Sequence, residues 1–197
     1  MKKIFASLFL LIVMSIFSFG AFAENTKFFG GDFGFSTGIP VYGGNADSPY
    51  KNRVIVGLTG DVSLKLGNPL KFLFGYDFLS DINWDGSQHK NHLDYAGWFG
   101  IKVYPGFGGL NASLAYALGA RTDFISERYI DSEGTEKKHS EVETTAWGNG
   151  FRLGAEYDFH HGSKYKMLPA LGFYYRMMPR GSNNYDNIFA FYVNMAF

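Results

Sequence analysis

The chain has 197 residues, no cysteine, and equal numbers of acidic and basic residues, so its formal net charge is +0. Without cysteine, a disulfide framework, a thiolate nucleophile, a cysteine-bound metal and a lipid attached through a terminal cysteine are all excluded. A neutral chain also gives no reason to expect nucleic acid or another highly charged partner.

The first 23 residues have the order of a secretory signal. In chain order they are the basic pair Lys2 and Lys3, an apolar stretch from Ile4 to about Phe19, and the small-x-small sequence Ala21-Phe22-Ala23. This order predicts a cleaved signal peptide over residues 1–23 and one β-barrel domain over residues 24–197. An uncleaved membrane anchor is the alternative, which the small residues directly after the apolar run disfavour.

After residue 23 the apolar residues are distributed by alternation. No apolar run there approaches the roughly 20 residues that a membrane helix needs. Recurrence of apolar residues at every second position predicts β-strands with one apolar face. The alternating segments are Lys27–Ile39, Val54–Leu66, Leu70–Phe78, Leu93–Val103, Leu110–Leu118, Trp147–Phe159, Met167–Met177 and Phe189–Phe197.

The connections between these segments alternate between long and short. Short turns are marked by Gly67-Asn68-Pro69 and by the glycine-rich run at Pro105–Gly109, and His160–Tyr165 forms a third turn. The longer stretches, expected as loops, are Val41–Asn52, Ser80–Asn91, Arg121–Thr145 with some hairpin at its base, and Pro179–Asn184. The sequence thus predicts an all-β, eight-stranded antiparallel up-and-down transmembrane β-barrel. Its short turns and termini would face the periplasm, and its four long loops the outside of the cell.

The second face of each strand separates a membrane barrel from a soluble one. A soluble ligand-binding calyx, the alternative, turns a densely charged face to water. Here the non-apolar positions are mostly Gly, Ala and Ser with isolated charges, which suits a narrow lumen filled by side chains. The apolar face is rich in aromatic residues near strand ends, as expected at the two headgroup layers.

The C-terminal segment carries Phe191, Val193, Met195 and a final Phe197. With the eight alternating segments, it resembles the small outer-membrane barrels of the OmpX, OmpW and OmpA-barrel type. The resemblance is one of architecture over residues 24–197. It implies that these four residues form the signal read by the outer-membrane barrel assembly machinery. It also implies a Gram-negative cell outer membrane as the location and outer-membrane lipids as partners. Activity stays open, because such barrels include adhesins, resistance factors, small channels and lipid enzymes.

Charged residues at the non-apolar positions predict a network inside the lumen, since isolated buried charges are costly. They are Asp32, Asp61, Lys65, Lys71, Asp77, Asp94, Lys102, Arg121, Arg152, Glu156, Asp158 and Arg176. Two interpretations are open. The charges either pair into a salt-bridge plug or line a gated path for small solutes.

No catalytic, cofactor or metal site is predicted. A lipid-modifying enzyme, the second alternative, would need a histidine-based site at the outer rim. The candidates are His89, His92 and His139, with Ser140 and Glu141 next in the chain. Consecutive strand residues point to opposite faces, so His139-Ser140-Glu141 makes a poor triad. Two histidines in a polar loop, such as His89 and His92, are more often solvated than bound to metal.

The loops contain Tyr42, Tyr50, Trp84 and Tyr129 among flexible polar residues. Exposed aromatics of this kind bind a host surface or another ligand, or anchor the rim in lipid. We therefore expect a non-enzymatic outer-membrane barrel with an envelope-structural or surface-interaction role through its long loops, and no nucleic-acid partner. A narrow channel for small solutes is the alternative.

Overall fold

The computed structural model describes residues 29–43, 51–67, 69–86, 88–130, 132, 134–161, 163, 167–181 and 184–196. The signal peptide predicted over residues 1–23 lies outside these ranges, and so do Tyr50 and Phe197. Within them, no helix is long and apolar enough to cross a membrane.

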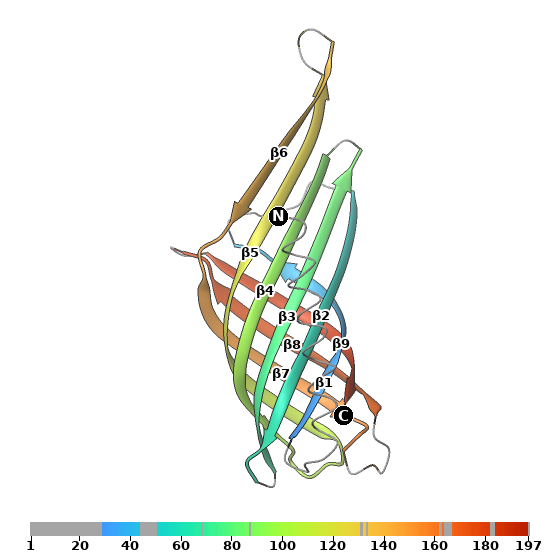
Figure 1. Ribbon diagram of the computed structural model, residues 1–197, viewed down its shortest axis with the longest axis vertical. Coiled ribbons are helices and arrows are strands. Elements are labelled where there is room, and N and C mark those ends of the chain that lie inside the picture. The colour runs from blue at the N-terminus through green and yellow to red at the C-terminus, as the bar shows by residue number, and fades with distance from the viewer. Residues whose placement is uncertain are drawn as a thin grey trace.

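The described residues form an all-β structure (Figure 1). Its strands are β1 (Phe29–Val41), β2 (Asn52–Lys65), β3 (Leu70–Asp85), β4 (Gln88–Val103), β5 (Leu110–Ile130), β6 (Glu136–Thr144), β7 (Gly148–Asp158), β8 (Leu168–Pro179) and β9 (Tyr185–Ala196). Each strand pairs antiparallel with its neighbours in the order β4-β3-β2-β1-β9-β8-β7-β5, and β4 pairs with β5 to close the ring. The predicted eight-stranded antiparallel up-and-down barrel is thereby confirmed. Strand β6 lies outside the ring and pairs with residues 122–130 of β5.

The strand register turns apolar residues outward and small or polar residues inward. On β9, Phe189, Phe191 and Val193 are exposed, whereas the intervening Ala190 and Tyr192 are buried. Because side chains alternate with a period of two, a slip of one residue would exchange the two faces. The register that the hydrogen bonds fix is therefore also the one that separates lumen from exterior.

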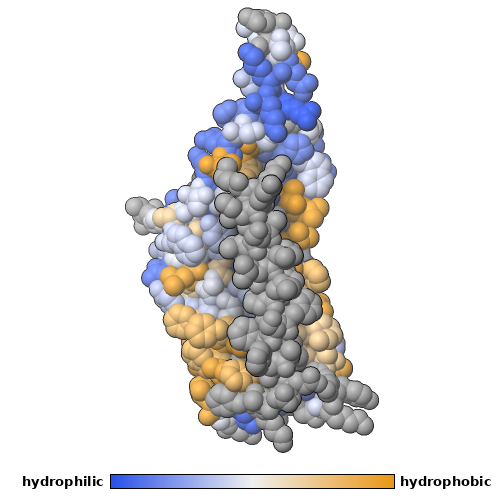
Figure 2. All heavy atoms as spheres, viewed as in Figure 1, coloured by the Kyte–Doolittle hydropathy of each residue, from blue (hydrophilic) through white to orange (hydrophobic). Residues whose placement is uncertain are grey.

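The exterior of the ring is covered by large apolar side chains. Phe35 is 71% exposed, Leu114 51% and Phe191 63%. Figure 2 shows such residues gathered on the lower body of the molecule, whereas the projecting β5–β6 hairpin is hydrophilic. A continuous apolar surface of this extent is unfavourable in water and fits lipid contact, which argues against the soluble calyx.

Two segments predicted as loops, the second with some hairpin at its base, are mostly strand. Residues 80–91 continue β3 and β4 to a turn at Gly86, whose φ of 56° suits glycine. Residues 121–130 of β5 and residues 136–144 of β6 form a hairpin, in which Thr122 pairs with Thr144 and Ile130 with Glu136. The hydrogen-bond ladders run past the apolar belt, because a strand that leaves the lipid needs backbone pairing but no apolar face. The predicted loops are instead a sheet that projects from one end of the barrel (Figure 1).

The lumen is less polar than the sequence predicts. Leu73, Leu79, Trp98, Tyr174 and Tyr192 are all buried inside the ring. Glycines make room for the larger rings, since a Cβ on Gly75 would lie 2.2 Å from the Trp98 ring and one on Gly172 2.4 Å from the Tyr192 ring. The small inward residues therefore complement aromatic side chains on neighbouring strands and do not leave an open bore.

We expect Leu114→Arg to destabilise the barrel in lipid vesicles by about 2–4 kcal/mol, because the guanidinium would face hydrocarbon. Val142→Arg is the matched control, because Val142 is similarly exposed but lies on the projecting β6. Denaturant unfolding followed by tryptophan fluorescence measures both. An equal loss in the two variants would mean that the apolar belt is not the lipid-facing surface.

Candidate functional site

The lumen holds a network of buried charges that falls into three clusters along the barrel axis. The turn-end cluster lies near the short turns and the ends of β1 and β9, the central cluster halfway along, and the hairpin-end cluster below the projecting sheet. Their carboxylates and cations come from strands far apart in sequence.

The turn-end cluster surrounds one ammonium group with three carboxylates. Lys102 Nζ lies 3.4 Å from Asp32, 3.5 Å from Asp61 and 3.1 Å from Glu156. An ammonium group has three N–H donors, so a single lysine can serve all three acceptors. Glu156 also accepts hydrogen bonds from Asn111 at 2.9 Å and from the Tyr192 hydroxyl at 3.0 Å. Asn194 donates to the second oxygen of Asp32.

A short relay extends this cluster toward the barrel end. Lys71 Nζ donates to the Tyr104 hydroxyl at 3.3 Å, and that hydroxyl donates to Asp158 at 3.1 Å. Burial raises the pKa of Tyr104, so its phenol stays protonated and remains a donor. The Tyr104 ring stacks on His161, with centroids 4.3 Å apart, and covers the turn end of the lumen.

The central cluster is built on Asp77, which is fully buried. It accepts hydrogen bonds from Thr59 at 2.7 Å and from Arg152 Nε at 3.2 Å, and Arg176 Nη1 lies 3.5 Å away. The Arg152 guanidinium carbon lies 4.4 Å from the Trp98 ring centroid and 4.2 Å from that of Tyr174. Cation–π contacts of this kind strengthen when water is excluded. This cluster joins β2, β3, β7 and β8 across the lumen.

The hairpin-end cluster is a chain of alternating charges that begins at Arg176. Arg176 pairs with Asp94, whose second oxygen lies 3.0 Å from Arg180. Arg180 Nε then contacts Asp186 at 2.7 Å, and Asp186 accepts from Arg121 at 2.6 Å. Although burial lowers the pKa of Arg180, a guanidinium this basic keeps its charge beside Asp186.

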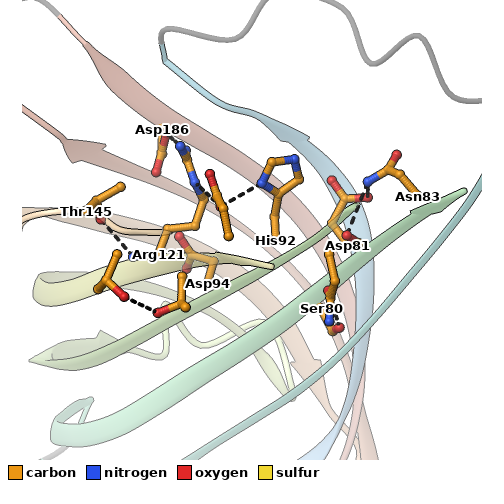
Figure 3. Close-up of polar contacts among 12 residues, drawn as sticks. Ser80, Asp81, Asn83, His92, Asp94, Arg121, Thr145 and Asp186 are labelled. Atoms are coloured by element: carbon orange, nitrogen blue, oxygen red, sulfur yellow. Dashed lines mark hydrogen bonds and ion pairs between the residues drawn. The ribbon is translucent and has the colours of Figure 1, made fainter. Parts of the chain in front are cut away.

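The last charged residues of the hairpin-end cluster contact two aromatic rings, those of His92 and Tyr42. Arg121 Nε contacts Asp123 at 2.9 Å, and Asp123 lies 2.7 Å from His92 Nδ1 (Figure 3). Tyr42 packs against His92 and Arg121, the two residues that contact Asp123. Its ring centroid lies 4.5 Å from that of His92 and 4.6 Å from the Arg121 guanidinium carbon. Burial, reinforced by Asp81, raises the pKa of Tyr42 and keeps this phenol neutral.

A separate ion pair lies beside the hairpin-end cluster. Arg53 binds Asp81 in a bidentate manner, with Nε and Nη2 both 2.8 Å from the carboxylate oxygens. Asp81 also accepts from the Asn83 amide at 3.0 Å (Figure 3). The inward face of the projecting sheet thus continues the polar pattern of the lumen beyond the lipid-facing belt.

The structure places the predicted lumen residues as follows. Buried in the three clusters are Asp32, Asp61, Asp77, Asp94, Lys102, Arg121, Arg152, Glu156, Asp158 and Arg176. Lys71 is half-buried in the relay. Lys65 does not belong with them, because β2 ends at this residue and leaves its side chain exposed. In the predicted assembly signal, Phe191, Val193 and Met195 are exposed on β9.

Several network residues are absent from the prediction, namely Arg53, Asp81, His92, Asp123, Arg180 and Asp186. All lie in or beside segments taken as loops. A period-two reading that continued through those segments would have placed Asp81 and His92 inward, because Asp77 and Asp94 have the same parity. Arg180 lies one residue beyond β8 and shares the parity of Arg176, so the same extension would also have placed it inward.

The histidine, serine and glutamate candidates lie on β4 and on β6. His139 and Glu141 lie on the same face of β6, 3.8 Å apart and exposed, whereas Ser140 between them points to the opposite face. His92 is buried against Asp123, and His89 lies on the opposite face of β4. Among the described residues, no group of three histidine or acidic side chains could hold a metal ion. Tyr42, predicted as an exposed loop aromatic, packs inside the rim, whereas Tyr129 is exposed.

Comparisons with known proteins bear on the fold. No family model matches the chain, and no curated protein matches it in sequence. The crystal structure of Neisserial surface protein A is similar with a TM-score of 0.50 and 14% identity, over 86% of this chain and 97% of that one. Ail, the attachment invasion locus protein of Yersinia pestis, gives 0.47 and 11% over 87% and 100%, and OprG from Pseudomonas aeruginosa 0.39 and 10% over 85% and 93%. The closed eight-stranded ring and the likeness to Neisserial surface protein A show that the chain has the fold of the small bacterial outer-membrane β-barrels.

We expect Arg152→Ala to lower the free energy of unfolding by about 3–5 kcal/mol, because it leaves Asp77 buried beside a cavity. Asp77→Ala and the double variant complete a mutant cycle, in which the double variant should cost clearly less than the sum. Lys138→Ala, on exposed β6, is the control and should leave the melting temperature unchanged. Equal melting temperatures for Arg152→Ala and Lys138→Ala would contradict a structural role of the central cluster.

We expect Lys102→Met to destabilise the barrel more at pH 8 than at pH 5. Methionine has a side chain of similar length to lysine but no charge, so the variant leaves Asp32, Asp61 and Glu156 without their shared cation. Their mutual repulsion disfavours ionisation in the folded state, which then binds more protons than the unfolded one, so stability falls as pH rises. The unfolding free energy of variant and wild type at both pH values measures this. The same loss at both values would show that the lysine contributes through packing alone.

Proposed function

We propose that this chain is an integral outer-membrane protein, exported by a cleaved signal peptide, that acts without catalysis. Its lumen is closed by the charge network, and its role is surface interaction or envelope structure through the sheet that projects from the barrel. The observation that carries the proposal is the central cluster, in which the Arg152 guanidinium lies between the Trp98 and Tyr174 rings and contacts Asp77.

This cluster disfavours the alternative of a solute channel. A path along the lumen would have to separate Asp77 from both Arg152 and Arg176, all of which are buried. Breaking one buried pair costs about 3–5 kcal/mol, and here two pairs share one carboxylate. A closed lumen leaves the outer surface and the projecting sheet as the places where the protein can meet partners.

The projecting sheet supports a role in surface interaction. Strands β3 and β4 pair up to Asp85 and Gln88, and β5 and β6 pair up to Ile130 and Glu136. All nine residues of β6 are exposed, and the hairpin that they form is hydrophilic (Figure 2). With the short turns facing the periplasm, this sheet would stand outside the cell.

Two measurements test the proposal. The chain after residue 23, refolded in detergent and inserted in a planar lipid bilayer, should show no discrete conductance, while a general porin handled identically provides the positive control. Reproducible openings would contradict the plug and favour the small channel.

Surface labelling tests the orientation. Because the chain lacks cysteine, Ser140→Cys and Phe107→Cys each introduce a single thiol, at the projecting hairpin and at a short turn. A membrane-impermeant maleimide should label Ser140→Cys on intact cells and Phe107→Cys only after the outer membrane is permeabilised. The reverse pattern would place the sheet in the periplasm and remove the surface role.

A further inference from the structure

In the described part of the chain, one edge of strand β6 is not paired with another strand. Within the described part of the chain, β6 pairs with β5 alone and forms the end of the sheet. The Thr145 amide donates to the Arg121 carbonyl, so the pair of Arg121 and Thr145 is hydrogen-bonded. Hydrogen-bonded and non-hydrogen-bonded pairs alternate along an antiparallel ladder. The backbone groups of Glu136, Lys138, Ser140, Val142 and Thr144 therefore point away from β5.

The sequence of β6 is complementary to itself when a second copy runs antiparallel. If Ser140 lies opposite Ser140 of the second copy, Lys137 lies opposite Glu143 and His139 opposite Glu141. The remaining pairs are Lys138 with Val142 and Glu136 with Thr144, and no two like charges are opposed. A shift of two residues is the nearest one that keeps the outward backbone groups opposed. It would place His139 opposite His139 in one direction and Glu141 opposite Glu141 in the other, so the charges favour the centred register.

The backbone and side chains agree on this register. The five residues whose backbone groups point outward would form the hydrogen-bonded pairs, at 140–140, 138–142 and 136–144. The charged pairs at 137–143 and 139–141 would then be non-hydrogen-bonded, and side chains approach most closely in such pairs. A twofold axis through Ser140 makes the interface isologous, so each favourable pair occurs twice.

We propose that the β6 edge binds the β6 edge of a second copy of this chain and joins the two projecting sheets into one. This inference rests on the proposed surface role and names its partner. The hairpin projects along the long axis of the barrel (Figure 1), so two antiparallel hairpins place their barrels at opposite ends. The pairing therefore joins copies in two facing membranes, not neighbours in one membrane.

Cysteine crosslinking tests the register. Under mild oxidation, refolded Ser140→Cys should form a disulfide-linked dimer, because the two thiols meet at the twofold axis. Ser126→Cys, which lies opposite Ser140 within the hairpin but one strand from the edge, is the matched control and should stay monomeric. Lys138→Cys and Val142→Cys should crosslink only when the two variants are mixed. Equal crosslinking of Ser140→Cys and Ser126→Cys would overturn the proposal.

Charge reversal tests the complementarity. In the Ser140→Cys background, Glu143→Lys opposes two lysines across both symmetric contacts and should reduce dimer formation about tenfold. Lys137→Glu should do the same by opposing glutamates, and the double reversal should restore the dimer. Dimer formation that is unaffected by the single reversals would show that the thiols meet through random collision, which contradicts the specific register.

The last step tests whether the contact spans two membranes. Two vesicle populations carrying Ser140→Cys with different tags should yield mixed-tag dimers when combined, and same-tag dimers alone would overturn the facing arrangement. Surface labelling of Ser140→Cys separates this inference from the proposed function. If the thiol is labelled on cells but never crosslinks, the pairing is wrong and the surface role stands. If it is not labelled even after reduction of disulfides, both fail.

Discussion

The narrow lumen of a closed eight-stranded ring is the constraint on which this structure depends. Such a ring has space for side chains but little for water, so every inward charge must find its partner on another strand. Arg152 reaches Asp77, 75 positions away, and Arg121 reaches Asp186, 65 positions away. Because a buried ion pair costs desolvation on both sides, its main effect is to penalise any register in which it is broken. The network therefore acts mainly by selecting one strand register, and it adds less to the stability of the barrel.

The two ends of the lumen satisfy their carboxylates by different chemistry. At the hairpin end, Asp94, Asp123 and Asp186 are bound by arginines, whose planar donors bridge two carboxylates each and produce a continuous chain. At the turn end, Asp32, Asp61 and Glu156 share the single ammonium of Lys102. At the turn end three carboxylates thus share one ammonium, and the neutral donors Asn111 and Tyr192 supply further hydrogen bonds to Glu156. The hairpin end instead joins three arginines and three aspartates in one connected series, which suits the base of a projecting sheet.

The molecule separates stability from interaction. The ring buries its charges and turns apolar residues to lipid, so neither surface is free to recognise a soluble partner. The projecting sheet has the opposite character, since β6 is exposed throughout and hydrophilic. An edge strand outside the membrane is a liability that charged side chains normally blunt. In β6, basic residues on one side of Ser140 are matched by acidic residues on the other. The charges therefore oppose pairing with most other strands but permit pairing with an identical strand that runs antiparallel.

The sequence by itself determined the barrel, because lipid outside and a packed lumen inside impose a period-two pattern that persists through each membrane-spanning segment. It also identified inward charges such as Asp77 and Arg152, whose parity is plain beside apolar neighbours. Only the tertiary structure decided which charges meet, since partners lie across the ring and no local pattern encodes that distance. It likewise decided that residues 80–85, 88–91, 121–130 and 136–144 are strands and that Lys65 lies outside the network. Beyond the lipid the apolar face is no longer required, so the periodic signal fades while backbone pairing continues.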